Sequence, residues 1–447
     1  MDLESRVQST WDVVVIGGGL AGLCAAIAAR RGGASVRLLE SAPPAFRGGN
    51  ARHARNFRIV HDAPTPHVPD SYHASEFIDE LDRVTAGERD PALAERLAGE
   101  SETIAPWLMT NGVHLQDPAV GIVPYSRRTV FPLGGGKAMI NALYATASDL
   151  GVTISADSEV GTLRQAADGC WRVSLAADSP GGSTLEARSV VVCAGGAGAD
   201  PDWLRSHYGD TADGFMVRGT AYANGRVLTD LISAGARTVG DPTVCHMVAV
   251  DARGPRFDGG IATRITAIPH GIVVDGSGAR IDATGAGAEP THYARWGPRI
   301  AACVDQTAYL ILDADGLQRA APQAFPPIVG TTIADLAAAL GLDPAALAHS
   351  TGAFNAALAA GARPIATAPF AAYPMRPGVT FVHYGVAVDQ HMRVIWTDGR
   401  RNDNLFAAGM IMAANVIGRG YLAGLGLTLA AVFGRLAGEE AARHVVG

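Results

Sequence analysis

The first forty residues contain the feature that most limits the fold, a buried strand followed by a glycine-rich turn and a helix. An apolar run from Val13 to Ile16 leads into the spaced glycines Gly17, Gly19 and Gly22. Gly17 permits the tight turn, Gly19 lets a pyrophosphate approach the backbone, and Gly22 lets helix and strand pack closely. The pattern predicts a dinucleotide-binding α/β fold.

The residues after the glycine turn indicate which nucleotide binds. A helix expected over residues 20–31 begins at Leu20 and Ala21 and points its unpaired amide groups at the phosphates. A strand over residues 35–39 ends at Glu40, whose carboxylate is placed to accept hydrogen bonds from ribose hydroxyls and to repel a 2′-phosphate. The pattern therefore indicates an unphosphorylated adenosine and leaves both FAD and NAD open.

Composition limits the kind of protein. The 447 residues are 48% hydrophobic, and the formal net charge of −7 argues against nucleic acid or an anionic membrane as a partner. The five cysteines lack the spacing of zinc or iron–sulfur ligands, so no metal site is expected. The start has no apolar signal core, and residues 421–433 are too few to span a bilayer, so we expect a cytoplasmic protein that is not integral to a membrane.

The composition and the spacing of apolar residues change along the chain, and these changes predict an inserted domain. Helical spacing over residues 75–85 and 91–111 indicates an excursion from the sheet. Residues 240–369 combine proline-rich joints with short strands, which favours a separate cap. We therefore predict a nucleotide-binding domain in two parts, 1–239 and 370–447, on either side of this cap.

Three further segments are distinctive beside the glycine turn. They are Arg47-Gly-Gly-Asn-Ala-Arg-His-Ala-Arg-Asn56, Gly134-Gly-Gly-Lys-Ala-Met-Ile-Asn-Ala-Leu143, and Leu405-Phe-Ala-Ala-Gly409 with glycines downstream. Together the four segments resemble the fumarate reductase and succinate dehydrogenase flavoprotein family, and two of them look most like its tricarballylate dehydrogenase branch. The resemblance spans nearly the whole chain. It implies a Rossmann-like FAD-binding domain of the glutathione-reductase type with an inserted α+β substrate cap domain.

The resemblance also implies where FAD lies, with its adenosine against Glu159 and Val160 and its flavin ring near residues 48–50 and 424–427. Some family members attach FAD covalently through a histidine six residues before the Gly-Gly pair, and Ala42 stands at that position, so non-covalent FAD is implied. Met410 replaces a glutamate that usually contacts the ribityl chain. The residues expected to contact FAD are Gly17, Gly19, Leu20, Ala21, Gly22, Glu40, Ser41, Gly48, Gly49, Asn50, Ala51, Val160, Ala194, Gly195, Gly409, Met410, Gly424, Leu425, Gly426 and Leu427.

Four residues are candidates for the chemistry. Desaturation by a flavin needs hydride transfer to N5 and removal of a proton from the neighbouring carbon. The resemblance places His246 as a substrate-facing histidine and Tyr421 as a hydroxyl that polarises a substrate oxygen, and His383 lies near another substrate histidine of the family. Arg419 is an alternative anion-binding residue. Structural histidines and a purely packing role for Tyr421 are the competing interpretations.

One segment departs from the family. Within residues 278–289 the family glutamate is replaced by Thr284, and the arginine that donates the proton in fumarate reductases is missing. Arg264, Arg295 or Arg299 is a possible replacement from neighbouring positions. This departure argues against fumarate reduction itself.

The sequence therefore predicts an FAD-dependent dehydrogenase or reductase that acts on a carbon–carbon bond beside a carboxylate or ketone. Tricarballylate-like acids are the nearest family substrates, and a separate redox protein, a quinone or oxygen accepts the electrons. The alternatives are a desaturase of a cyclic ketone, as in 3-ketosteroid dehydrogenases, and a flavin-bound redox partner or sensor with a degenerate site. A flavin monooxygenase usually needs an NADPH site as well. It is disfavoured because no second Gly-x-Gly-x-x-Gly motif follows a strand in this sequence.

Overall fold

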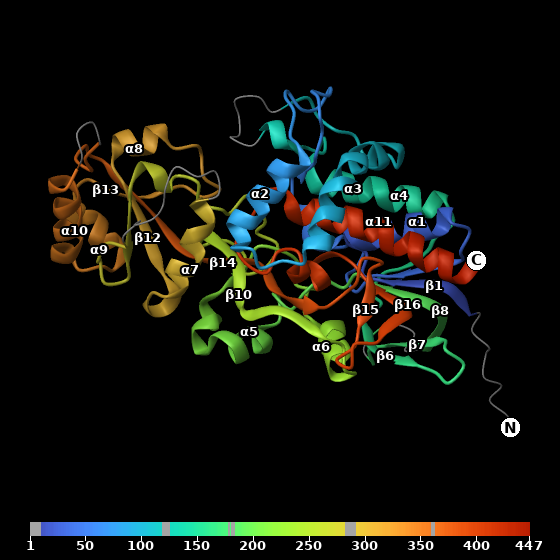
Figure 1. Cartoon of the computed structure of the whole chain (residues 1–447). Helices are drawn as coiled ribbons and strands as arrows, with labels where there is room; N and C mark the ends of the chain where they lie inside the picture. The colour runs from blue at the N-terminus through green and yellow to red at the C-terminus, as the bar shows by residue number, and fades with distance from the viewer. Residues whose placement is uncertain (1–9, 119–125, 178, 180–183, 282–291, 359–362) are drawn as a thin grey trace. The chain divides into compact units, whose positions relative to one another are not determined.

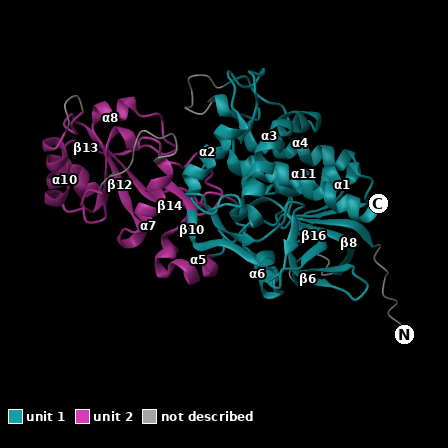
Figure 2. Cartoon of the chain, viewed as in Figure 1, with its two compact units in different colours: residues 1–200, 220–245, 381–447 teal, residues 201–219, 246–380 magenta. Residues whose placement is uncertain are grey.

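The chain forms two compact units, each built from segments that are separate in the sequence (Figure 2). The first unit contains residues 1–200, 220–245 and 381–447, and the second contains residues 201–219 and 246–380. The computed structural model describes residues 10–118, 126–177, 179, 184–281, 292–358 and 363–447. The division that the sequence predicts, into 1–239, 240–369 and 370–447, stays a prediction.

The first unit is organised around a mostly parallel sheet (Figure 1). Its strands run in the spatial order β15 (Arg393–Ile395), β16 (Arg401–Ala407), β8 (Thr184–Val192), β1 (Trp11–Ile16), β2 (Val36–Leu39) and β5 (Thr153–Ser155). The pairs from β16 to β5 are parallel, β15 is antiparallel to β16, and β6 (Val160–Gln165) and β7 (Trp171–Leu175) extend β8 as an antiparallel meander. Every residue from Val13 to Ile16 is buried, as parallel strands covered on both faces require.

Two helices from opposite ends of the chain pack together in this unit. Helix α1 (Leu20–Arg31) follows β1, and α11 (Leu425–Val446) is the last helix. A Cβ atom added to Gly434 of α11 would lie 2.3 Å from the carbonyl oxygen of Ala21. One added to Gly438 would lie 2.2 Å from the carbonyl oxygen of Ala25. The two backbones therefore approach more closely than any larger side chain would allow.

The remaining elements of the first unit include the helical excursion expected from the sequence. Helix α3 begins after Asp90, whose side chain accepts a hydrogen bond from the Leu93 amide at 3.0 Å. No helix among the described residues is long and apolar enough to cross a membrane. The remaining helices and strands are α2 (Ala74–Thr85), α3 (Pro91–Thr110), α4 (Gly135–Asp149), α6 (Arg226–Ser233), β3 (Phe57–Arg58) and β4 (Thr129–Val130).

The second unit contains most of a six-stranded sheet, and two strands of this sheet, β10 and β14, also have residues that belong to the first unit. Its central strands run in the order β10 (Thr238–Asp251), β14 (Phe370–Val386), β12 (Ala308–Leu312) and β11 (Ile272–Asp275), and β9 (Met216–Val217) and β13 (Ile328–Gly330) also pair with β14. Alternate residues of β12 enter two different apolar clusters. The helices are α5 (Pro201–Tyr208), α7 (Trp296–Ala301), α8 (Ala314–Arg319), α9 (Ile333–Leu340) and α10 (Pro344–Ala356).

Candidate functional site

The glycine turn after β1 is held by close backbone packing. Gly17 has a φ angle of +100°, and a Cβ atom there would lie 2.5 Å from the carbonyl oxygen of Cys193. A Cβ atom on Gly22 would lie 1.8 Å from the carbonyl oxygen of Gly17. Both positions therefore require glycine for the fold itself, because strand, turn and helix touch there without room for a side chain.

Gly19 faces open space instead. A Cβ atom on Gly19 would meet only the carbonyl oxygen of Gly48, at 3.8 Å, and one on Gly49 would meet only the Cα atom of Gly19, at 3.7 Å. Gly19 is the N-cap of α1 and has no side-chain cap, and no acidic residue lies in the first turn. The positive end of α1 thus opens onto a glycine-lined space that fits a phosphate group.

Glu40 ties this turn to the segment that follows β2. The side chain is buried and accepts hydrogen bonds from the amides of Gly18 at 3.1 Å, Ala42 at 2.8 Å and Gly48 at 3.5 Å. Burial raises the pKa of this carboxyl, and the amide donors act in the opposite direction. The Ser41 hydroxyl lies 3.4 Å from Glu40 Oε1. The ribose-binding role of Glu40 stays a prediction.

Two residues that the sequence interpretation missed complete this part of the site. The Tyr144 hydroxyl on α4 donates to the Gly18 carbonyl at 2.9 Å, and the Arg47 guanidinium carbon lies 4.0 Å from the centre of the Tyr144 ring. Burial, followed by the charge of Glu40, raises the pKa of Tyr144. Helical spacing in the Gly134 segment is the signal that places Tyr144 on a buried face.

Residues 48–51 and Gly409, which are expected to contact FAD, make close contacts within the first unit. The Asn50 side chain accepts a hydrogen bond from the Thr220 amide at 2.9 Å. A Cβ atom on Gly136, in the first turn of α4, would lie 2.0 Å from the Ala51 carbonyl oxygen, and one on Gly409 would lie 2.8 Å from the Ala21 Cβ atom. Together with the approach of Gly49 to Gly19, these contacts place Gly49 and Gly409 beside the start of α1.

Other expected FAD residues lie on the same unit. Gly195 follows β8 with a φ angle of +76°, and Val160 is the buried first residue of β6. The Met410 sulfur lies 3.9 Å from the Cβ position of Gly426 at the start of α11. Ala194 precedes Gly195, and Leu425 and Leu427 are buried in the first turn of α11. Direct contacts of these residues with FAD stay predictions.

Three candidates for the chemistry lie in the first unit. Tyr421 is partly buried and packs against Phe131 and Ala423. Arg419 is half-exposed, and its Nε atom lies 3.2 Å from a carboxylate oxygen of Glu88. His383 is buried, and its Nδ1 atom lies 2.8 Å from the Ile417 carbonyl oxygen. Arg419 thus already has an acidic partner, whereas Tyr421 belongs to the turn that leads into α11.

The other three candidates lie in the second unit. His246 is buried in β10. The Arg264 guanidinium carbon lies 4.4 Å from the centre of the Tyr293 ring, and its Nε atom is buried without a hydrogen-bond partner in the described part of the chain. Arg295 is exposed at the N-cap of α7. The departing positions from Thr284 onwards lie outside the described residues, and the roles of all six candidates stay predictions.

His383 is expected to make stability depend on pH. Burial lowers its pKa, and hydrogen bonds to the carbonyls of Ile417 and Gly420 oppose this only in part. As pH falls below about 6.5, the unfolded chain binds a proton that the folded chain resists, so stability is lost. His383→Gln should make the free energy of urea unfolding less dependent on pH between 7.5 and 5.5, by up to about 1.4 kcal/mol per pH unit. The same substitution at exposed His444 is the control, and equal slopes for both variants would contradict the prediction.

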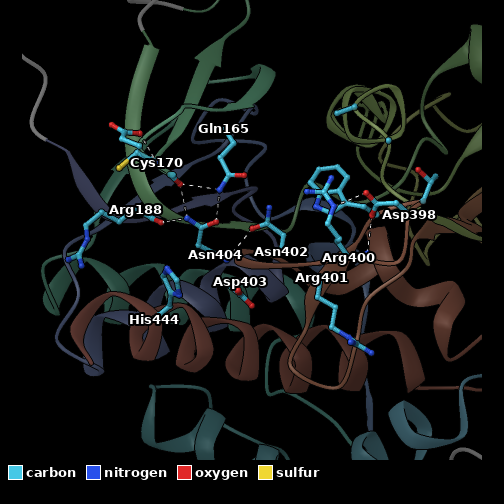
Figure 3. Close-up of a pocket in the computed structure, with 16 residues that line it drawn as sticks. Gln165, Cys170, Arg188, Asp398, Arg400, Arg401, Asn402, Asp403, Asn404 and His444 are labelled. Carbon is cyan, nitrogen blue, oxygen red and sulfur yellow. Dashed lines mark hydrogen bonds and ion pairs between the residues drawn. The ribbon is translucent and has the colours of Figure 1, made fainter.

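A polar pocket of about 690 Å³ lies elsewhere on the first unit (Figure 3). Asn404 holds its wall, because its side-chain oxygen accepts from Trp171 Nε1 at 2.9 Å and its nitrogen donates to the carbonyls of Gly169 and Arg188 at 2.9 and 2.8 Å. The arginine side chains along the pocket are paired with aspartates, as in Arg400 with Asp398. None of the residues predicted for FAD or catalysis lines this pocket.

The chain is similar to fumarate reductases over nearly all its length. It is 26% identical to the NADH:fumarate oxidoreductase of Klebsiella pneumoniae, with 99% of this chain and 49% of the relative covered, so it spans about half of that protein. It is also 26% identical to a probable fumarate reductase of Shewanella frigidimarina, with 98% and 76% covered.

Solved structures show the same fold. A flavocytochrome c3 fumarate reductase in an open conformation superposes with a TM-score of 0.80 at 24% identity, covering 98% of this chain and 79% of the other. The 3-ketosteroid-Δ4-(5α)-dehydrogenase of Rhodococcus jostii RHA1 gives a TM-score of 0.73 at 23% identity, covering 98% and 99%. The predicted α/β fold is therefore confirmed.

The family described as FAD binding domain matches residues 12–427, which is most of the chain. The match includes β1, the glycine turn and the open N-terminal end of α1, and it continues into the first residues of α11. It confirms FAD as the cofactor, and the flavoenzymes with which the chain aligns agree with this. The glycine-lined end of α1 fits the phosphates of that cofactor, and this chain belongs to the FAD binding domain family.

Proposed function

We propose that the protein is an FAD-dependent oxidoreductase that removes or adds hydrogen across a carbon–carbon bond beside a carboxylate or ketone. The observation that carries the proposal is the open, glycine-lined space at Gly19 and Gly49, in a chain that aligns with fumarate reductases from end to end. When bound, FAD supplies a hydride acceptor. The chain itself must then supply a group for the proton and one that polarises the substrate.

Tyr421 is the residue we propose to polarise the substrate. It belongs to the turn that precedes α11, it is partly buried, and its ring is fixed by Phe131 and Ala423. A positioned hydroxyl stabilises negative charge on a carbonyl or carboxylate oxygen. His246 is our proposal for the proton-handling residue, and His383, Arg264 and Arg295 are further candidates. Arg419 ranks below them because it pairs with Glu88 on the surface.

The proposed substrate class is a small carboxylic acid or ketone. The strings around Gly48 and Gly134 favour an acid of the tricarballylate type, and the missing proton-donating arginine argues against fumarate. FAD is proposed to be non-covalent because Ala42 occupies the attachment position. A separate redox protein, a quinone or oxygen is proposed as the electron acceptor, and the cytoplasm as the compartment.

A second candidate is a desaturase of a cyclic ketone. The superposition with a 3-ketosteroid dehydrogenase, which is matched over 99% of its length, supports it. A tyrosine that hydrogen-bonds a ketone oxygen suits this reaction as well as the first. A third possibility, a flavin-bound redox partner or sensor, is favoured only by the departures from the family pattern.

Anaerobic flavin bleaching tests these alternatives. The oxidised protein is mixed with tricarballylate, other saturated di- and tricarboxylic acids, and saturated cyclic ketones, and absorbance near 450 nm is followed. Bleaching by one class within seconds supports an enzyme for that class, and reoxidation of the dithionite-reduced protein by the matching unsaturated compound checks the reverse direction. Flavin that remains oxidised with every compound, and reduced with every unsaturated one, would contradict the proposal and favour a sensor.

A further inference from the structure

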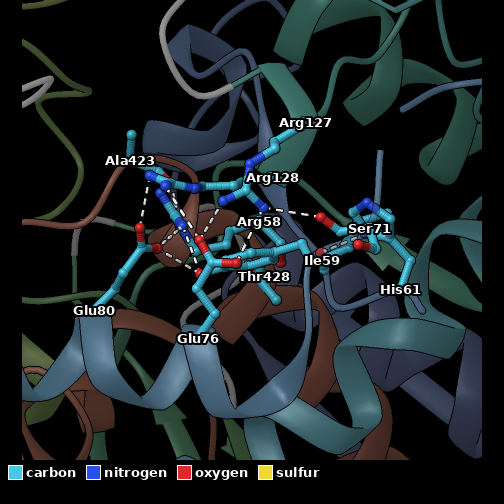
Figure 4. A network of polar contacts seen from close by, with 11 residues as sticks. Arg58, Ile59, His61, Ser71, Glu76, Glu80, Arg127, Arg128, Ala423 and Thr428 are labelled. Atoms are coloured by element: carbon cyan, nitrogen blue, oxygen red, sulfur yellow. Dashed lines mark hydrogen bonds and ion pairs between the residues drawn. The ribbon is translucent and has the colours of Figure 1, made fainter. Parts of the chain in front are cut away.

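A buried ion cluster lies beneath the turn that precedes α11 (Figure 4). At its centre is Arg58 of β3, whose side chain is 2% exposed. Arg58 Nε donates to the Ala423 carbonyl at 2.9 Å. Arg58 Nη1 donates to the Tyr72 hydroxyl at 2.7 Å and to Glu80 Oε2 at 2.5 Å. One guanidinium group therefore joins the C-terminal turn to helix α2.

The backbone of Arg58 holds the same turn. Its amide donates to the Gly424 carbonyl at 3.3 Å, and its carbonyl accepts from the Thr428 hydroxyl at 2.6 Å. Gly424 has a φ angle of +84°, and a Cβ atom on it would lie 2.7 Å from the Arg58 nitrogen. Three hydrogen bonds and one close approach thus fix residues 423–428 against Arg58.

Glu80 completes the cluster and connects it to the surface. This buried carboxylate accepts from the Tyr72 hydroxyl at 2.6 Å, and Arg128 Nη1 lies 2.6 Å from its second oxygen. Glu76 pairs with Arg127 and Arg128 at the outer, more exposed end. Three guanidinium groups and two carboxylates leave one positive charge in excess.

Such a cluster is a costly way to obtain stability alone. Removing charged groups from water is unfavourable, and apolar residues of similar size often stabilise a core equally well. A guanidinium group also fixes the directions of the hydrogen bonds it donates, because its planar fork holds several acceptors in one geometry. In Arg58, one of these hydrogen bonds is donated to the carbonyl of Ala423, two residues after Tyr421.

We propose that Arg58 is a positioning residue for the flavin ring. It holds residues 423–424, at the start of one of the two segments that the resemblance places near the ring. The other segment ends at Asn50, eight residues before Arg58 in the chain. The proposal rests on the flavin placement given above, and it requires no particular substrate. Its role is to keep the Ala423–Gly424 turn, and with it Tyr421 and the first amides of α11, in one position against the cofactor.

The test compares Arg58→Lys with Arg127→Gln as FAD complexes. Lysine keeps the charge but cannot reach Ala423, Tyr72 and Glu80 together. We expect Arg58→Lys to change the visible circular dichroism of the bound flavin, to shift its midpoint potential, and to release FAD about 10-fold more readily on dilution, because one charge-assisted hydrogen bond is lost. Arg127 contacts Glu76 and the Ser71 carbonyl and makes none of the contacts to the turn given above, so its variant should match the wild type in all three.

Two outcomes would overturn the proposal. If Arg58→Lys lowers only the melting temperature and leaves the flavin signals unchanged, the cluster is structural. If Arg127→Gln changes the flavin signals as much as Arg58→Lys does, the flavin responds to the net charge of the cluster and not to the position of the turn. Should Arg58→Lys not fold, the double variant Arg58→Met/Glu80→Leu is measured in its place, because it removes the buried pair together. Flavin bleaching with substrates is scored separately, so failure of the substrate assignment does not affect this result.

Discussion

The Gly19→Ala variant is expected to fold like the wild-type chain and to lose most of its FAD. A Cβ atom at this position would meet protein only at 3.8 Å, and the backbone there, with a φ angle of −74°, suits any residue. The added methyl group would instead enter the space into which the first amides of α1 point. We expect FAD affinity to fall by at least about 10-fold, equal to about 1.4 kcal/mol. The ratio of flavin to protein absorbance after gel filtration measures it.

Gly22→Ala is the matched control for this prediction. The same methyl group would there lie 1.8 Å from a backbone oxygen, so it should destabilise the fold by about 3 kcal/mol or more and reduce soluble yield. The two variants separate a glycine needed for the cofactor from one needed for packing. A Gly19→Ala protein that keeps its full yellow colour, or that unfolds like Gly22→Ala, would show that the open space is not the phosphate site.

The Tyr421→Phe variant is expected to keep FAD and to lose most of its reactivity. The ring contacts with Phe131 and Ala423 are retained in phenylalanine, so stability and flavin content should stay near wild type. Loss of a hydroxyl that stabilises charge in the transition state lowers the rate by about 100-fold or more. Stopped-flow absorbance measures the rate of flavin reduction, with the compound that bleaches the wild-type flavin as the substrate.

Tyr309→Phe is the control for this second prediction. Tyr309 is also partly buried and packs in the apolar core of the second unit, so the change removes a hydroxyl of the same kind far from the predicted FAD residues in the chain. Its bleaching rate should equal that of the wild type. Unchanged rates in Tyr421→Phe would mean that this tyrosine only packs, and His246 and His383 would then be substituted next.

The parts of the fold that depend on local sequence were predictable. The strand, glycine turn and helix from Trp11 to Arg31 follow from residue spacing, because the apolar run, the spaced glycines and the helical residues follow one another directly in the chain. Helices α2 and α3 were expected within a residue of their observed ends, because their apolar residues recur at helical spacing.

The polar contacts of the site were not predictable in this way. Arg58 and Ala423 are 365 residues apart, and Tyr144 and Gly18 are 126 apart. Each partner is an ordinary residue in its own segment, and only the folded arrangement of the sheet and helices makes them neighbours. The same holds for the ion pair of Arg419 with Glu88, 331 residues earlier in the chain, and the anion-binding role of Arg419 stays a prediction.

The close contact between α1 and α11 has a consequence for how the protein is made. Helix α1 packs against α11, and the Thr428 hydroxyl donates to the Arg58 carbonyl, 370 residues earlier in the chain. A growing chain therefore cannot complete its cofactor-binding unit until α11 has been synthesised. Until then the alanine-rich face of α1 remains uncovered, which makes the unfinished polypeptide a natural client for chaperones.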